Sequence, residues 1–149
     1  MRFILLLAVP LLVQSSKLPE SAPEVVAIEI IDGAAAVSIN RSGEVRYIDA
    51  DPTTAKGQKR LMIGPDGFAR LQRRLQRYRL QAKPTKTGPK AWIANVDCGD
   101  WISNQDSMII QWIGPRSSHL YFVDFGCDYK NQAARNGDLL STVNSIPRP

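Results

Sequence analysis

The sequence contains few of the residues that commonly carry out chemistry. Its 149 residues include two cysteines and one histidine. It lacks a Gly-x-Ser-x-Gly, Ser-x-x-Lys or His-Glu-x-x-His motif and a glycine-rich phosphate loop. A single histidine without a Cys-x-x-Cys pair does not supply the ligands of a tetrahedral zinc site. We therefore expect no metal and no cofactor, and a catalytic site would have to be assembled from distant residues.

Long apolar runs are absent except for Phe3–Val13. This run is shorter than the roughly 20 residues that cross a bilayer, so we expect no transmembrane anchor. It follows Arg2 and ends at small residues, an order typical of a secretory signal peptide over residues 1–15, cleaved near Ser15. An apolar first strand is the alternative. Residues 16–24 contain two prolines and predict a disordered leader ahead of a periplasmic or secreted domain.

Charge is modest and its balance is basic. The chain has 19 Lys and Arg residues against 14 Asp and Glu, a formal net charge of +5. An exported protein rarely meets nucleic acid, and the aromatic residues do not interleave with the basic ones as they do in single-strand binding surfaces. We therefore expect no nucleic-acid partner.

The two cysteines, Cys98 and Cys127, are expected to form a disulfide, because an oxidising compartment keeps such pairs oxidised. Closing a loop of about 30 residues would stabilise the fold by roughly 3 to 4 kcal/mol in the chain-entropy model.

The hydrophobic pattern predicts a small single α+β domain over residues 25–147. About six to seven short antiparallel strands, in two meander or hairpin groups, would pack with two helical segments. Asp32-Gly33 is a strong hairpin signal. A basic linker over residues 81–90 is expected between two half-units. The predicted strands cover residues 25–31, 35–39, 44–49, 61–63, 91–96, 108–113 and 119–125, with the sixth central and covered on both faces.

The clearest helix begins at Gly64-Pro65-Asp66 and is expected to end near Arg79. Its predicted buried stripe comprises Phe68, Leu71, Leu75 and Tyr78. A second helical segment is predicted from about residue 128 to 146, capped by Asp128 or Asn131. Asn136-Gly137 interrupts its pattern, so two shorter helices are the alternative.

The other surface of the first helix carries a stripe of arginines. Guanidinium groups bind phosphate and carboxylate in a bidentate manner, so the stripe is a candidate anion-binding surface. Its alternative is a solvated helix face whose long side chains cover apolar surface. The arginines are Arg70, Arg73, Arg74 and Arg77.

The loop after Cys98 is a second candidate surface. A tryptophan among polar residues on a rigid loop is typical of a protein-facing or sugar-stacking anchor. Packing of the ring onto the disulfide is the alternative. Asp97, Asp100, Asp124 and Asp128 flank the two cysteines and would either bind a cation or cap turns. The candidate residues of the loop are Asp100, Trp101, Asn104 and Gln105.

These features favour a non-catalytic binding protein of the cell envelope. Its partner would be a protein or an anionic envelope component, whose identity the sequence does not reveal. The alternatives are a small hydrolase with an unconventional site and a structural or accessory envelope protein.

Overall fold

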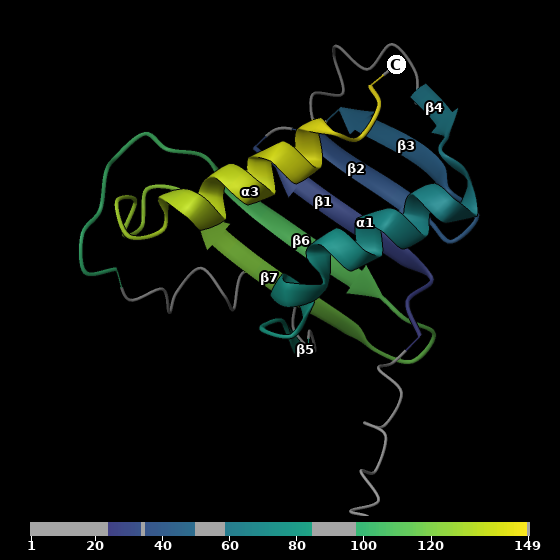
Figure 1. The fold of residues 1–149 in the computed structure, drawn as a ribbon, viewed down its shortest axis with the longest axis horizontal. Helices are drawn as coiled ribbons and strands as arrows, with labels where there is room; N and C mark the ends of the chain where they lie inside the picture. The colour runs from purple at the N-terminus through teal and green to yellow at the C-terminus, as the bar shows by residue number, and fades with distance from the viewer. Residues whose placement is uncertain (1–23, 34, 50–58, 85–97, 149) are drawn as a thin grey trace, which may run out of the picture.

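A computed structural model describes residues 24–33, 35–49, 59–84 and 98–148. The predicted signal peptide, the first residues of the leader and the predicted strand at 91–96 lie outside the described residues. The described part is a small α+β domain with a seven-stranded antiparallel sheet, two helices and one disulfide (Figure 1). The predicted fold class is therefore confirmed.

The strand order is β4-β3-β2-β1-β6-β7-β5, so the two expected groups of strands join into one sheet through β1 and β6. The hairpin at Asp32-Gly33 and the β3 bounds are confirmed, and the other strands shift by a few residues at their ends. The strands are β1 (Ala27–Asp32), β2 (Ala35–Asn40), β3 (Glu44–Asp49), β4 (Lys59–Met62), β5 (Lys83–Pro84), β6 (Ser107–Ile113) and β7 (Ser118–Asp124).

The expected linker is partly a strand. Lys83 and Pro84 pair with Leu120 and His119 of β7. The chain leaving α1 (Gly64–Arg79) therefore joins the sheet at once, on the edge that β7 would otherwise present.

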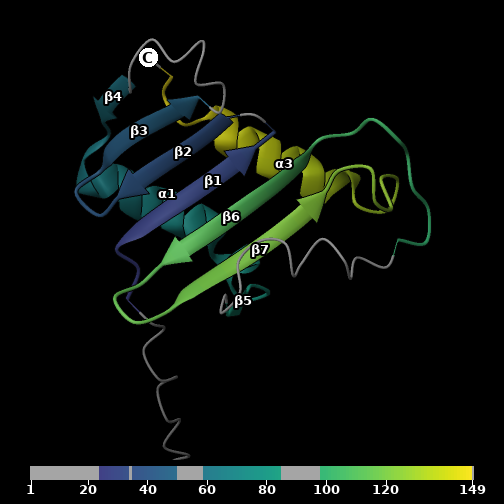
Figure 2. The same cartoon turned by 180° about the vertical axis from the view of Figure 1, so that it is seen from behind.

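Alternation along the strands places the core on one face of the sheet. In β6, Met108, Ile110 and Trp112 are buried, while the residues of the opposite face, such as Ile109, are half-buried or exposed. Both helices, α1 and α3 (Ala133–Asn144), lie across the first of these faces (Figures 1 and 2). The expectation that helices or strands would cover both faces of β6 is therefore wrong for the described elements. The apolar pattern correctly predicted that β6 lies inside the sheet. It did not show that only one face is covered, because an apolar residue such as Ile109 looks the same in the sequence whether it is buried or half-buried.

Helix α1 has the predicted bounds and the predicted stripe. Proline in its first turn fits a position where the backbone N–H needs no partner, and Asp66 faces the positive end of the helix dipole. Phe68, Leu71, Leu75 and Tyr78 are all buried against the sheet.

Helix α3 is continuous through Asn136-Gly137, but it begins at Ala133 rather than near residue 128. Neither predicted cap is used. Asp128 has φ 47° and binds the loop after Cys98 through its side chain, so Gln132 occupies the cap position without a side-chain bond. Among the described residues, neither helix is long and apolar enough to cross a membrane.

Candidate functional site

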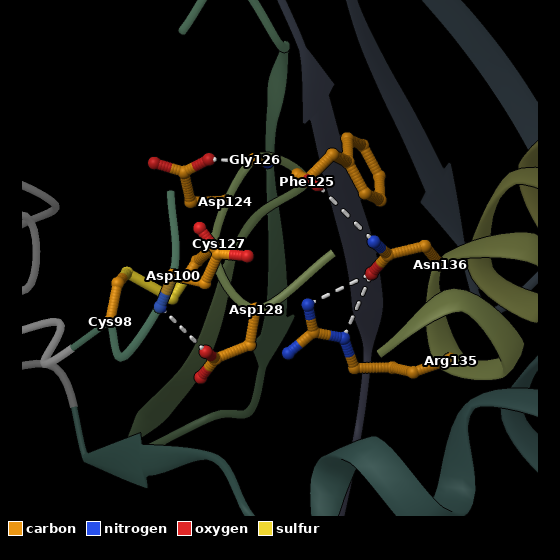
Figure 3. The surroundings of a disulfide bond; sticks show 9 residues. All are labelled: Cys98, Asp100, Asp124, Phe125, Gly126, Cys127, Asp128, Arg135 and Asn136. Carbon is orange, nitrogen blue, oxygen red and sulfur yellow. Dashed lines mark hydrogen bonds between the residues drawn. A yellow bond between two sulfur atoms is a disulfide. The ribbon is translucent and has the colours of Figure 1, made fainter. Parts of the chain in front are cut away.

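The disulfide between Cys98 and Cys127 is present, as predicted, with the two Cα atoms 5.2 Å apart (Figure 3). The loop formed by residues 98–106, called here the disulfide loop, is also held by its backbone. The amide of Ile102 donates to the Gly126 carbonyl at 3.0 Å, and that of Phe125 donates to the Asp106 carbonyl at 3.1 Å. The loop is therefore bound to the end of β7 along its length, and is not merely tied at one point.

Aspartates strengthen the same arrangement. The Asp128 carboxylate accepts from the Asp100 amide at 3.0 Å, and the Asp128 amide donates to the Asp100 carbonyl at 2.7 Å. The Asp124 carboxylate accepts from the Gly126 amide at 2.8 Å. These carboxylates act as turn caps, one of the two alternatives. Within the described ranges there is no cluster of three or more His, Cys, Asp or Glu residues that would hold a metal ion. Asp97 lies outside those ranges.

Trp101 is 59% exposed, although its backbone forms a β-bridge with Cys127. A Cβ at Gly126 would overlap the Ile102 carbonyl and lie 3.3 Å from the indole nitrogen of Trp101. Glycine therefore lets the loop approach closely, and the indole rests on Gly126 by one edge. The ring of Trp101 is therefore largely exposed and is not buried against the disulfide. Asp100, Asn104 and Gln105 are exposed beside it, and Asn104 adopts φ 66°.

The four arginines of the stripe fall into two pairs, one that connects the helices and one that does not. Arg74 donates to the Ser145 hydroxyl at 2.8 Å, and Arg77 forms an ion pair with Asp138. Both residues thus connect α1 to α3. Arg70 and Arg73 are exposed and make no hydrogen bond or ion pair with the described residues. Only this second pair retains the character of a free anion-binding surface.

The contact between the helices centres on Asp138. Its carboxylate accepts from the Tyr78 hydroxyl at 2.6 Å as well as from Arg77. These two hydrogen bonds hold the pKa of Asp138 below its usual value. Burial, followed by the bond to Asp138, raises the pKa of Tyr78 to about 12. The Arg77 guanidinium also lies over the Tyr78 ring, 5.1 Å from its centroid. Asp138 was not among the residues predicted from sequence.

A second link, also not predicted, joins α3 to the disulfide. The side-chain NH₂ group of Asn136 donates to the Phe125 carbonyl at 3.3 Å, and the side-chain oxygen of Asn136 accepts from the Arg135 guanidinium at 2.8 and 3.0 Å (Figure 3). No sequence signal identifies this link, because residues 125 and 136 meet only through the turn that follows the disulfide. Phe125, which bonds to the disulfide loop through its backbone amide, is thus also bonded to α3 through its carbonyl.

Comparison with known proteins finds no match to a family model, to a curated protein or to a solved structure. Function is therefore inferred from the surfaces of this chain alone.

Proposed function

We propose that this protein is an exported, non-catalytic binding protein that engages a partner protein through its disulfide loop, with Trp101 as the anchor. The observation that carries this proposal is the 59% exposure of a tryptophan on a backbone already fixed by a disulfide and hydrogen bonds. Binding residues with large energetic effects are enriched in tryptophan. A loop that is ordered before binding loses little entropy when the complex forms.

The chemistry around Trp101 favours a particular kind of partner. Asp100 and Asp106 are exposed acidic residues, and Asn104 and Gln105 are exposed amides. A complementary surface would offer an apolar pocket for the indole and basic groups at its rim, since charge complementarity steers association. We therefore expect a partner with a basic binding face.

The proposal is tested by affinity capture from envelope extract with quantitative mass spectrometry. The purified protein is compared with Trp101→Ala and with Leu80→Ala, whose side chain is 79% exposed at the end of α1. We expect a protein that the wild type and Leu80→Ala both capture and Trp101→Ala does not. With the purified partner, the loss of affinity should be about 30-fold or more, the effect of a typical hot-spot residue.

Two outcomes would contradict the proposal. In the first, wild type and Trp101→Ala retain the same proteins in equal amounts. In the second, the wild type retains no protein above a blank resin. Circular dichroism and thermal unfolding of each variant establish that the fold is intact, so that a loss of capture is due to the missing indole.

Arg70 and Arg73 support a second candidate function, the binding of an anionic envelope component. They are exposed, and they do not connect the helices as Arg74 and Arg77 do. The double variant Arg70→Glu/Arg73→Glu should abolish sedimentation with anionic vesicles, and added salt should weaken the wild-type interaction. Reversing Arg77 would be a poor test because it would also break the Asp138 ion pair. Unchanged sedimentation of the double variant would rule this candidate out.

A further inference from the structure

A pocket of about 300 Å³ opens where the end of α1, the middle of β7 and the start of α3 meet. This volume is at the lower end of the range for small-molecule sites. The pocket is separate from the disulfide loop and from Arg70 and Arg73. Its polar lining consists of Arg77, Tyr78, Gln81, Tyr121, Gln132 and Arg135.

The pocket has an excess of positive charge. The Arg77 guanidinium is offset by Asp138, but Arg135 is bonded to the neutral side chain of Asn136 and forms no ion pair with the described residues. Ala134, from the first turn of α3, also lines the pocket. That turn has no acidic residue and no side-chain cap, so the positive end of the helix dipole is not neutralised there. An anionic group would be favoured at this end of the pocket.

Tyr121 gives an independent indication of a ligand. Only 8% of the residue is exposed, it lines the pocket, and its hydroxyl forms no hydrogen bond with any described residue. Its ring is held against that of Tyr78, with the centroids 5.4 Å apart. The hydroxyl is accessible, because it is not among the fully buried side-chain atoms that lack a partner in the described residues. A fixed phenol whose hydroxyl is accessible at the pocket is suited to bind a group that enters it.

The remaining lining residues are suited to hydroxyl groups. Gln81 donates its amide N–H to the Arg77 carbonyl at 3.1 Å, which orients the side chain and leaves its oxygen as an acceptor. Gln132 makes no capping bond with its own helix. Amides both donate and accept hydrogen bonds, as sugar hydroxyls require.

We propose that this pocket binds a small acidic sugar. Arg135 and the first turn of α3 would hold its carboxylate or phosphate, and Tyr121, Gln81 and Gln132 would bind its hydroxyls. The inference does not rest on protein binding by the disulfide loop. Loss of one activity would leave the other in place.

Isothermal titration calorimetry of the purified protein tests this with three probes: glucuronate, glucose 6-phosphate and glucose. The first two distinguish a carboxylate from a phosphate head group, and glucose is the neutral control. We expect one or both acids to bind while glucose does not. Arg135→Gln should weaken binding by at least about tenfold, the effect of losing a charged hydrogen bond. Tyr121→Phe should weaken it by roughly threefold to tenfold. Arg116→Gln, at an exposed arginine in the turn between β6 and β7 and outside the pocket, should bind as the wild type does.

Amide chemical shifts of the wild-type protein provide a second measurement that does not depend on how the variants fold. Titration with the bound acid should shift the amides of Ala134 and Arg135 and leave that of Trp101 unchanged. The proposal is overturned if neither acid binds at millimolar concentration, or if glucose binds as tightly as the acids. It is also overturned if Arg116→Gln weakens binding as much as Arg135→Gln does, or if the shifted amides lie elsewhere.

Discussion

Asp138 is a half-buried acid on α3 that accepts hydrogen bonds from two side chains of α1, Tyr78 and Arg77. Few side-chain contacts join these helices, so the loss of this carboxylate should weaken the attachment of α3 to α1. We expect Asp138→Asn to lower the free energy of unfolding by about 1 to 2 kcal/mol. Urea denaturation measures the effect. Asp100→Asn is the matched control, because the bonds of Asp100 to Asp128 use its backbone.

The difference between wild type and Asp138→Asn should depend on pH. Because the folded pKa of Asp138 is lowered, its contribution to stability is fully present above the unfolded pKa, about 3.9, and is lost as pH falls through the folded value. The two proteins should therefore differ most near neutral pH and become similar in stronger acid. A difference that stays constant from pH 7 down to pH 2 would contradict the role assigned to the ionised carboxylate.

At the scale of the elements, what could be predicted from sequence follows from how local each signal is. The buried stripe and proline of α1 lie within the helix itself, and its bounds were predicted correctly. The start of α3 was not, because Asp128 has a capping side chain but uses it on Asp100, a residue far away in the sequence. The order of strands, which joins β1 to β6, depends on pairing across most of the chain and left no local signal.

The candidate sites, like the helices and strands, were predicted only where the signal is local in the sequence. Trp101 and the disulfide were identified because residue type and spacing are visible in the sequence. The pocket was not, since Arg135 and Tyr121 acquire their importance only when α3 is placed against β7. The arginine stripe was predicted as one surface, but the position of α3 divides it, because Arg74 and Arg77 face that helix.

The turn between β2 and β3 provides a test of how closely two elements approach. Gly43 has φ 81°, and a Cβ there would overlap the backbone of Gly64, where α1 begins. Gly33, in the turn between β1 and β2, has φ 57° but open space around it. Gly33→Ala should cost about 1 to 2 kcal/mol, from backbone strain alone. Gly43→Ala should cost about 3 kcal/mol or more, since overlap adds to the strain. Equal losses in denaturant melts would show that the approach to Gly64 is not rigid.

Across the described part of the molecule, the two helices cover one face of the sheet, and the disulfide loop leads into the start of β6, beside the end of β7 (Figure 2). The core cluster includes residues of β1, β2, β3, β6, β7 and both helices, but no residue of the loop. The loop therefore does not depend on the hydrophobic effect of the main core for its order. It depends on one covalent bond, a few backbone hydrogen bonds and the hydrogen bond from the Asp100 amide to the Asp128 carboxylate. The loop can therefore lose its order without unfolding of the sheet.

This separation predicts how the protein responds to loss of the disulfide. In Cys98→Ser/Cys127→Ser, the free energy of unfolding should fall by about 3 kcal/mol, because the unfolded chain is no longer cross-linked. Hydrogen exchange should increase most at the amides of Asp100 and Ile102, whose partners lie across the disulfide. The amides of β1, paired on both sides, should remain protected relative to these. If the loop amides kept their wild-type protection, backbone bonds alone would fix Trp101. If β1 lost protection to the same degree as the loop, the two would unfold as one unit, and the loop would not be an independently held binding element.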